Sequence, residues 1–447
     1  MEQSIFRSYD IRGVYPGELN EDAAFFIGGA LVRLTSAKKV FVGRDMRSSG
    51  EALQGALMKG IAADGAEVHD AGMVPVDFQY WAVPQFNYDA GIIVTASHNP
   101  KEYNGFKMVD KERMIRGKEI AEEIKRMGGA NDRSSVQAGN EGNVIRVDYW
   151  GDYIVHILKF VDVKKLKKLK VVVDAGNGMA GAVFSRLMPH LPIEIIPMFF
   201  EPDGTFPNRS PNPFISGALD QLKTRVVAEK ADFGVALDAD SDRIFFVDEK
   251  GGFVQADVTL LLLARYWLDR EPGAGIAYNL VCSRAVPEFI TEWGGRPLKS
   301  AVGFVNVRQA LQEGKGVMGG EVSAHYCFRD NYYGDSGYIA FVNFLEVLSQ
   351  AEKPLSALAK EYTRYCRGDE VNFTVQDAAA VMAALEKKYH DAKIDKLDGI
   401  TFEYPDWWFN VRSSNTEPLL RVTVEGNDCR IMETKRNEIS EFIQSMS

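Results

Sequence analysis

The chain has 447 residues, too many for one compact core, and this length predicts three or four domains. A net charge of −10 argues against nonspecific nucleic-acid binding, apolar stretches such as 260–264 are too short to span a bilayer, and no signal-peptide pattern opens the sequence. The four cysteines form no Cys-x-x-Cys pair, so we expect neither a disulfide framework nor a cysteine zinc site, and a reducing cytoplasm fits this usage.

Three segments share one pattern: an apolar strand, a turn with glycine or polar residues, and then a helical stretch. They are residues 39–45, 171–178 and 275–280. Buried strands that alternate with helices predict α/β units with largely parallel sheets. The segments lie more than a hundred residues apart, which indicates repeated domains and not a solenoid.

The last part of the chain has a different pattern. A short strand is followed by a helix over 377–389, by strands near 399–404 and 419–424, and by a final helix over 432–443, which together predict a small α+β domain. We therefore expect three similar mixed α/β domains and one C-terminal α+β domain. Their predicted ranges are 1–145, 146–250, 251–367 and 368–447.

A hydroxyl stands at the exit of a predicted buried strand. The strand over 91–94 leads into Thr95-Ala96-Ser97-His98-Asn99-Pro100. Ligand sites in α/β sheets form at such strand exits, which makes Ser97 a candidate reactive group. Upstream side chains that we expect to contact an anion are Tyr9, Arg12, Arg44, Arg47 and Ser48.

Three carboxylates alternate along one loop between two apolar strands. The loop is Asp238-Ala239-Asp240-Ser241-Asp242-Arg243, between strands over 233–237 and 244–247. Like charges this close raise one another's pKa unless a cation neutralises them, and oxygen-only ligands favour Mg²⁺. A polar hairpin turn is the alternative. A calcium-binding EF-hand is disfavoured, because apolar residues replace the glycine and later ligands that its loop needs.

Two later loops carry polar groups suited to a sugar phosphate. The first offers Glu321, Ser323 and His325, and a carboxylate can accept protons from two vicinal hydroxyls. As an isolated motif it is weak, and such a histidine is often structural. The second loop begins at Arg412 and contains hydroxyls and an amide that would cradle a phosphate dianion. A turn held by side-chain-to-backbone bonds is its alternative.

Taken together and in this order, the loops resemble those of the α-D-phosphohexomutase superfamily over the whole chain, and most closely its phosphomannomutase/phosphoglucomutase branch. The resemblance implies four domains around a central cleft. It implies that Ser97 carries the phosphoryl group and that Mg²⁺ is bound by the Ser97 phosphate, Asp238, Asp240 and Asp242. It assigns the sugar hydroxyls to Glu321 and Ser323 and the nonreacting phosphate to Arg412, Ser414, Asn415 and Thr416.

The resemblance also implies a reaction centre and a reaction. The centre is lined by Tyr9, Arg12, His98, Lys107 and Arg243, and Lys107 and His325 are the candidate proton-transfer groups. The reaction is the reversible interconversion of hexose 1-phosphate and hexose 6-phosphate, with mannose, glucose or both, through phosphoserine and a hexose 1,6-bisphosphate that also acts as activator. We expect a monomer or weak dimer, with hinge motion near 366–370 that closes the site against water.

Several residues bear on the choice of sugar. Val281 stands where many relatives carry a cation, and Phe304 stands where many have histidine after glycine. Asn415 and Val322 fit the mannose/glucose branch better than phosphoglucosamine mutases. The discrimination between epimers at C2 rests on one small contact change and is not readable from the sequence.

Three alternatives to this assignment stay open. A phosphoglucosamine mutase would use the same loops on another sugar. A serine-dependent metal phosphatase would release inorganic phosphate, and it would favour a second metal cluster, which the sequence lacks. A noncatalytic sugar-phosphate-binding protein would be credible if Ser97 or one of the carboxylates were missing, and all are present.

Overall fold

A computed structural model describes residues 2–128, 143–413 and 419–446. Its internal contacts divide the chain into two compact units, Met1–Val254 with Ala324–Ser356, and Gln255–Ser323 with Ala357–Ser447. The segment Ala324–Ser356, which we assigned to the third domain, thus packs within the first unit. The division into four domains stays a prediction.

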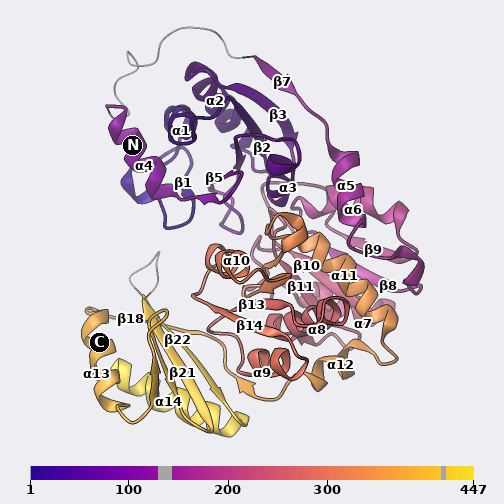
Figure 1. The fold of residues 1–447 in the computed structure, drawn as a ribbon, viewed down its shortest axis with the longest axis vertical. Helices are drawn as coiled ribbons and strands as arrows, with labels where there is room; N and C mark the ends of the chain where they lie inside the picture. The colour runs from indigo at the N-terminus through magenta and orange to yellow at the C-terminus, as the bar shows by residue number, and fades with distance from the viewer. Residues whose placement is uncertain (1, 129–142, 414–418, 447) are drawn as a thin grey trace. The chain divides into compact units, whose positions relative to one another are not determined.

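The first unit begins with a mixed sheet (Figure 1). Its strands in spatial order are β1 (Ile11–Val14), β5 (Tyr103–Asp110), β4 (Ala90–Val94), β2 (Lys39–Arg44), β3 (Glu67–Met73) and β7 (Val144–Arg146), with β6 (Met114–Ile115) paired to β5. Strands β4, β2, β3 and β7 run parallel, whereas β5 is antiparallel to both β1 and β4. The accompanying helices are α1 (Glu21–Thr35), α2 (Gly50–Ala63), α3 (Asp77–Gln85) and α4 (Gly117–Arg126). Every residue of β4 is buried, because this inner strand has a strand on either side and contacts helices α1, α2 and α3.

Helices α1 and α2 approach each other at a glycine. A Cβ atom on Gly60 would lie 1.9 Å from the carbonyl oxygen of Phe25, so only glycine fits there. This close contact seals an apolar core under the sheet, with Leu31, Leu57 and Ile61 fully buried. The rigid base that results holds the strand exits in place.

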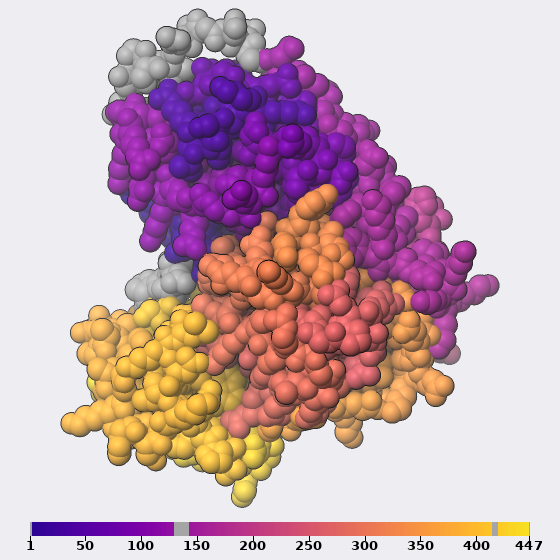
Figure 2. All heavy atoms as spheres, viewed as in Figure 1, coloured from indigo at the N-terminus to yellow at the C-terminus, as the bar shows by residue number. Residues whose placement is uncertain are grey.

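The second sheet of the first unit runs β12 (Phe253–Val254), β11 (Ile244–Asp248), β10 (Phe233–Leu237), β8 (Lys170–Asp174) and β9 (Glu194–Met198). Its helices are α5 (Trp150–Leu158), α6 (Ala180–Leu187), α7 (Asp220–Glu229) and α11 (Gly337–Gln350), and β16 (Tyr326–Phe328) precedes α11. Although α11 comes late in the sequence, Phe344 packs on Phe246 of β11 with ring centroids 4.0 Å apart. The orange segment therefore adjoins the magenta one in Figures 1 and 2.

The second unit contains a parallel sheet and a mostly antiparallel one. In the first, β13 (Gly275–Asn279) pairs with β14 (Arg296–Ser300) and β15 (Met318–Gly320), accompanied by α8 (Ala256–Arg270), α9 (Ala285–Glu292) and α10 (Phe304–Glu313). The second runs β17 (Cys366–Arg367), β22 (Leu419–Gly426), β21 (Trp407–Ser413), β20 (Ile400–Glu403) and β19 (Lys393–Asp395), with β18 (Val371–Thr374) also on β22. Helix α12 (Leu355–Glu361) leads into it, and α13 (Ala378–Lys388) and α14 (Cys429–Gln444) pack on it.

These elements confirm the predicted class, mixed α/β sheets followed by an α+β C-terminal part. Helices α13 and α14 fall on the two predicted helices of that part, and each begins at an aspartate cap. Asp377 accepts from the Ala380 N–H, and Asp428 accepts from the Ile431 N–H. Among the described residues, no helix combines the length and apolar character needed to cross a bilayer.

The expectation of no disulfide was wrong. Cys366 and Cys429 are bonded, with their Cα atoms 5.0 Å apart. Antiparallel pairing sets Cys366 opposite Gly426, and α14 begins three residues later, which brings Cys429 alongside. The two cysteines are 63 residues apart in the chain, so no local spacing pattern announced the bond. Cys282 and Cys327 are buried and form no disulfide.

We predict that the denatured, unreduced protein exposes two reactive thiols and that reduction raises the count to four, because two of the four cysteines are paired. Thiol titration in guanidinium, with and without prior reduction, measures both counts. The Cys366→Ser/Cys429→Ser double variant is the control and should give two thiols under either condition. Four thiols before reduction would contradict the bond.

Candidate active site

Ser97 follows β4 in a conformation that the surrounding structure must hold. It has φ of 51°, in the left-handed region, and it is fully buried. A residue other than glycine pays about 1–2 kcal/mol to adopt this conformation. The Ser97 N–H donates to Thr95 Oγ1 at 2.9 Å, and the Thr95 N–H donates to the Gly105 carbonyl of β5 at 2.9 Å. The loop is thereby tied to its own sheet.

The three predicted metal ligands converge on Ser97. Asp238, Asp240 and Asp242 lie between β10 and β11, are fully buried, and offer ligand oxygens within 4.8 Å of one another. Ser97 Oγ donates to Asp238 Oδ2 at 3.3 Å, and Thr95 Oγ1 donates to Asp240 Oδ2 at 3.3 Å. Two loops from two sheets of the first unit therefore form one site.

Lys107 of β5 neutralises part of this negative charge. Its Nζ donates to Asp240 Oδ2 at 2.8 Å and to Asp242 Oδ2 at 2.6 Å. Burial acts to lower the pKa of Lys107, but the two carboxylates outweigh it and raise that pKa well above its ordinary value. Lys107 is therefore an ammonium group that can donate a proton or a hydrogen bond but cannot act as a base in this arrangement.

His98 and Arg243 border the serine hydroxyl. His98 Nδ1 lies 3.2 Å from Ser97 Oγ and accepts from Arg243 Nη2 at 2.8 Å. Burial, and then the charges of Arg243, Arg12 and Lys107, hold the pKa of His98 well below its usual range. The imidazole is therefore neutral and resists protonation.

His325 belongs to the same cluster. Its Nε2 accepts from Arg243 Nε at 3.3 Å and also lies 3.4 Å from Asp242 Oδ1. A proton on this nitrogen would turn it from an acceptor facing Arg243 into a donor facing Asp242. The predicted proton-transfer role of His325 stays a prediction.

The acidic cluster fits a hard divalent cation. Asp240 Oδ1 is buried and accepts no hydrogen bond from the described residues, which leaves an oxygen for a ligand to satisfy. Burial first, and then Asp242 and Asp240, raise the pKa of Asp238 to about 7. A cation would coordinate the Asp240 oxygen and offset the repulsion among the carboxylates that raises the pKa of Asp238. A site built from carboxylate oxygens favours Mg²⁺.

Mg²⁺ binding should weaken below neutral pH. The pKa of Asp238 is about 7 without metal, so below that value a proton must leave before the ion can bind. We expect up to a tenfold loss of Mg²⁺ affinity for each pH unit below about 7 and little change above it. Calorimetric Mg²⁺ titrations near pH 6, 7 and 8 measure this, and equal affinities at all three would contradict it.

The metal loop rests on the N-termini of α3 and α11. The Val76 N–H donates to the Asp240 carbonyl at 3.2 Å, and Ser336, the N-cap of α11, donates its hydroxyl to Asp77 Oδ2 at 2.7 Å. A Cβ atom on Gly337 would already lie 3.1 Å from the Ser241 carbonyl. The segment Ala324–Ser356 thus supports the loop from behind.

Asp77 should make the stability of the fold depend on pH. Burial raises its pKa to about 7, although the Ser336 hydroxyl acts to lower it. Because the pKa of Asp77 is raised in the folded protein, its contribution to the free energy of unfolding is complete below the ordinary carboxyl pKa and is lost as the pH rises towards 7. Between pH 5 and 7, Asp77→Asn should gain about 1.4 kcal/mol of unfolding free energy relative to wild type for each pH unit. Urea unfolding at several pH values measures this, and a constant difference would disprove it.

Tyr9 lies just before β1, the edge strand of the first sheet, and Arg12 lies on that strand. Arg12 of β1 donates to Asp10 Oδ2 at 2.8 Å and to the Asn99 side chain of the serine loop. Tyr9 is half-buried in the bend before β1. Arg12 is therefore linked to the serine loop, and its place at the reaction centre and its contact with a ligand stay predictions.

We expected Arg47 to contact an anion, but in the structure its guanidinium binds backbone carbonyls. Its guanidinium donates to four backbone carbonyls of the serine loop, those of Ser97, Asn99, Pro100 and Tyr103, at 2.6–2.9 Å. Its side chain is fully buried beside Asp45. Sequence reasoning missed this role, because an arginine near a phosphate loop is indistinguishable in sequence from an arginine that binds phosphate.

In the second unit, Glu321 and Ser323 lie together at the end of β15. Ser323 Oγ donates to Glu321, and Glu321 Oε2 also accepts from the Asn279 side chain and from the Gly303 N–H, both at 3.2 Å. Gly303 has φ of 114° and caps α10, so the carboxylate anchors the start of that helix.

The two residues that depart from the family pattern lie in different surroundings. Val281 is buried, with 1% of its surface exposed, whereas Phe304 opens α10 and is half-buried. Phe304 directly follows the Gly303 whose N–H binds Glu321, so it lies next to a predicted sugar-binding group. Its effect on the choice of sugar stays a prediction.

The predicted phosphate loop is described only in part. Arg412 lies near the end of β21 and pairs through Nη2 with Glu370 Oε2 at 2.5 Å, and Arg421 of β22 pairs with the other oxygen of Glu370 at 3.3 Å. Register sets Arg412 opposite Arg421, so one carboxylate balances two cations. A phosphate at Arg412 would compete with Glu370. Ser414, Asn415 and Thr416 lie outside the described residues.

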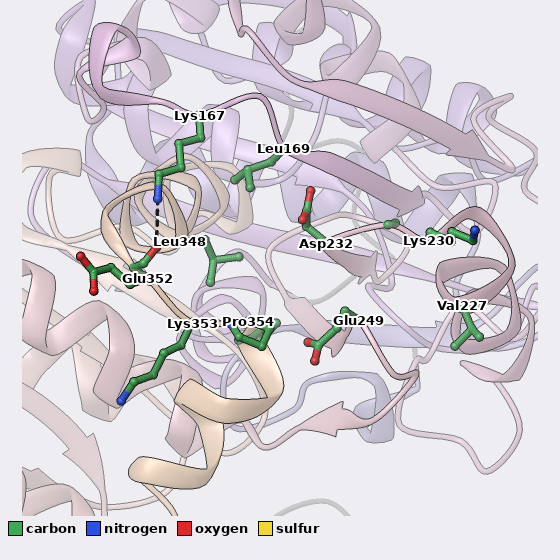
Figure 3. Close-up of a pocket in the computed structure, with 13 residues that line it drawn as sticks. Lys167, Leu169, Val227, Lys230, Asp232, Glu249, Leu348, Glu352, Lys353 and Pro354 are labelled. Atoms are coloured by element: carbon green, nitrogen blue, oxygen red, sulfur yellow. Dashed lines mark hydrogen bonds between the residues drawn. The ribbon is translucent and has the colours of Figure 1, made fainter.

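A hollow of about 540 Å³ elsewhere in the first unit contains none of the candidate site residues (Figure 3). Lysines and acids face it together, among them Lys167, Lys230, Asp232 and Glu249. Lys167 Nζ is bonded to the Ala351 carbonyl at 3.0 Å, and Glu249 accepts from Ser356. These two charged groups thus have partners within the fold, and we assign no ligand to the hollow.

Comparison with known proteins agrees with the geometry. Four family models match in chain order: phosphoglucomutase/phosphomannomutase α/β/α domain I (residues 3–133), domain II (151–252), domain III (255–365) and the C-terminal domain (370–441). Together they cover most of the chain.

Individual relatives match over nearly their whole length. A protein of Xanthomonas campestris named phosphohexose mutases is 38% identical, with 98% of this chain and 99% of that protein covered. The phosphomannomutase/phosphoglucomutase of Pseudomonas aeruginosa is 35% identical over 95% of this chain and 92% of that protein. A crystal structure of a phosphoglucomutase/phosphomannomutase family protein from Burkholderia thailandensis superposes with a TM-score of 0.89 at 34% identity, covering 100% and 98%. The chain belongs to the phosphoglucomutase/phosphomannomutase family of the α-D-phosphohexomutase superfamily.

Proposed function

We propose that the protein is an isomerase that interconverts hexose 1-phosphate and hexose 6-phosphate, with mannose, glucose or both as the sugar, through phosphorylated Ser97 and a hexose 1,6-bisphosphate. The observation that carries the proposal is the approach of Ser97 Oγ to within 3.3 Å of Asp238, inside a buried triad of carboxylates. A hydroxyl beside an oxygen-only cation site is what phosphoryl transfer requires. Family membership supports the same reaction.

The residues of the first unit divide the chemical work. When the sugar hydroxyl attacks phospho-Ser97, a new O–P bond forms as the Ser97 Oγ–P bond breaks, the hydroxyl loses its proton, and Ser97 Oγ gains one. Lys107, an ammonium group, is the candidate donor of the proton that Ser97 Oγ gains, and His325 is the candidate acceptor of the hydroxyl proton. Lys107 and Arg243 also supply positive charge to the transferring group, and neutral His98 lies 3.2 Å from Ser97 Oγ, beside the departing oxygen. Bound Mg²⁺, held by Asp238, Asp240 and Asp242, would offset the remaining negative charge.

The other site residues complete the proposal. We assign Glu321 and Ser323 to the sugar hydroxyls, and Arg412, Ser414, Asn415 and Thr416 to the phosphate that is not reacting. Tyr9 and Arg12 line the reaction centre, and His325 is a proton-transfer candidate through its contacts with Arg243 and Asp242. The bisphosphate then reverses its orientation, so that its other phosphate returns to Ser97.

Several wider properties belong to the same proposal. We propose the four-domain division, a monomer or weak dimer, hinge motion near 366–370, hexose 1,6-bisphosphate as activator and a cytoplasmic location. The cytoplasm is supported by the charge of the phosphosugars, which do not cross membranes unaided. The Cys366–Cys429 bond is unusual for a reducing compartment, which makes the thiol count a check on this point as well.

³¹P NMR of the pure protein tests the function directly. The protein is incubated with Mg²⁺, a trace of hexose 1,6-bisphosphate and, in separate tubes, mannose 1-phosphate, glucose 1-phosphate or glucosamine 1-phosphate. We expect the mannose and glucose signals to move to those of the 6-phosphates, and their relative rates measure the preference. Conversion of the glucosamine compound alone would assign the protein to the phosphoglucosamine mutases. Inorganic phosphate as the only product would favour the phosphatase alternative, and three unchanged spectra would contradict catalysis.

A further inference from the structure

Arg47 occupies the centre of the serine loop and not its surface. Its Nη2 donates to the carbonyls of Ser97 at 2.7 Å and Asn99 at 2.6 Å. Its Nη1 donates to those of Pro100 at 2.7 Å and Tyr103 at 2.9 Å. The planar guanidinium therefore donates hydrogen bonds to four carbonyls within a seven-residue stretch of chain. Its donors are fixed in a rigid fork, which the ammonium group of a lysine lacks.

The guanidinium is itself fixed from several sides. Arg47 Nε lies 3.3 Å from Asp45 Oδ2, and the Arg47 N–H donates to Asp45 Oδ1 at 2.9 Å. The ring of Phe206 covers it, with the guanidinium carbon 5.2 Å from the ring centroid. A Cβ atom on Gly204 would lie 2.7 Å from the Cα of Arg47, so the neighbouring loop also closes tightly. The Arg47 side chain itself is fully buried, and its bond to the Ser97 carbonyl is buried with it.

The bonds from Arg47 help to hold the unusual backbone conformation of Ser97. Ser97 has φ of 51°, which is unfavourable for serine, and this conformation directs Oγ towards Asp238. The Ser97 N–H is held by Thr95 at 2.9 Å and its carbonyl by Arg47 at 2.7 Å. Both ends of the strained residue are therefore bonded, which keeps a costly conformation populated.

We propose that Arg47 is a positioning residue for the phosphoryl-carrying serine: it holds the Ser97 backbone so that Oγ stays in line with the acidic triad. The inference rests on the proposed function, because it requires Ser97 to be the carrier. It adds a residue that contacts neither the substrate nor the metal. Its energetic effect should fall on phosphoryl transfer, since a small displacement of a reacting atom can cost about 10²-fold in rate.

The second sheet contains the same arrangement, a buried arginine that binds both an aspartate and a backbone carbonyl of a functional loop, and this supports the inference independently. Arg209 is buried, its Nε donates to Asp174 Oδ2 at 2.9 Å, and its Nη2 donates to the Leu237 carbonyl at 2.7 Å. Leu237 directly precedes Asp238, so this arginine holds the exit of β10 as Arg47 holds the loop after β4. The serine loop and the metal loop are thus each held by a buried arginine, and each arginine pairs with an aspartate at the end of a neighbouring strand.

Arg47→Lys tests the inference, because lysine keeps the charge beside Asp45 but loses the fork. We expect kcat to fall about 10²-fold while KM for hexose 1-phosphate stays within about threefold, since the proposed sugar and phosphate contacts are unchanged. The rate of Ser97 phosphorylation by hexose 1,6-bisphosphate in a single turnover should fall by the same factor. Arg33→Ala, which removes a surface arginine paired with Asp64, is the control and should leave both rates unchanged.

The outcomes separate three cases. A normal kcat in Arg47→Lys, or a loss that matches its unfolded fraction by circular dichroism, would overturn the positioning role. If Arg47→Lys does not fold, Asp45→Asn decides, because it loosens the guanidinium without removing it; the same loss of kcat at constant KM supports the role, and wild-type kcat overturns it. Full activity in Ser97→Ala would sink the proposed function itself, whatever Arg47 does.

Discussion

Ser97→Ala should lower kcat by about 10⁴-fold or more, because the variant has no oxygen to carry the phosphoryl group. Ser97 Oγ makes only long contacts, 3.3 Å to Asp238 and 3.2 Å to His98, so its removal should cost about 1 kcal/mol of stability or less. The variant should therefore fold normally. Activity with hexose 1-phosphate and bisphosphate, measured beside a thermal melt, separates the two effects.

Ser185→Ala is the matched control for this change. It also deletes one serine hydroxyl, but that hydroxyl donates to the Gly181 carbonyl within α6, away from the acidic triad. Its kcat should equal that of wild type. A Ser97→Ala enzyme with near-normal turnover would show that another group carries the phosphoryl or that none is transferred to the protein.

Asp240→Asn should raise the Mg²⁺ concentration for half-maximal activity by about tenfold or more, which corresponds to about 1.4 kcal/mol of lost binding. Asp240 is fully buried, and its Oδ1 is the oxygen that accepts no hydrogen bond from the described part of the chain. The amide keeps the shape but removes the charge, and Lys107 then faces Asp242 as its main counterion. Mg²⁺ titrations of activity, and of binding by calorimetry, measure the effect.

Asp248→Asn is the control at the other end of β11. Its carboxylate accepts from the Lys250 and Gly252 N–H groups in a turn and belongs to no acidic cluster. It should leave the Mg²⁺ titration unchanged. If Asp240→Asn also titrates like wild type, the ligand role of Asp240 fails, whatever its activity.

The sequence predicted the chemical groups of the first unit, because each stands at a strand exit. Apolar runs ended at Val94 and Leu237, and the residues that followed were a serine and three alternating aspartates. Each strand exit is a place where a ligand site can form on its own sheet. However, β4 and β10 belong to different sheets, so the approach of Ser97 to Asp238 depends on how the two sheets pack and was not predictable from strand order alone. The helices α13 and α14 were predictable, since each has a regular apolar pattern and an aspartate cap.

The remaining features depend on contacts that no local pattern encodes. Arg47 is bound to carbonyls fifty or more residues away, and backbone acceptors leave no trace in a sequence. Cys366 meets Cys429 only after β17 pairs with β22. The return of α11 to the first unit likewise requires the packing of Phe344 on Phe246, and neither residue identifies its partner.

The most direct test is to follow one phosphate. The protein is phosphorylated with ³²P-labelled hexose 1,6-bisphosphate, the labelled residue is located by peptide mass spectrometry, and the isolated phosphoenzyme is mixed with unlabelled glucose 1-phosphate and mannose 1-phosphate in turn. We predict one label per chain, on Ser97, that moves to a hexose bisphosphate within a single turnover. Label on another residue, or label that leaves only as inorganic phosphate, would contradict a phosphoserine mutase.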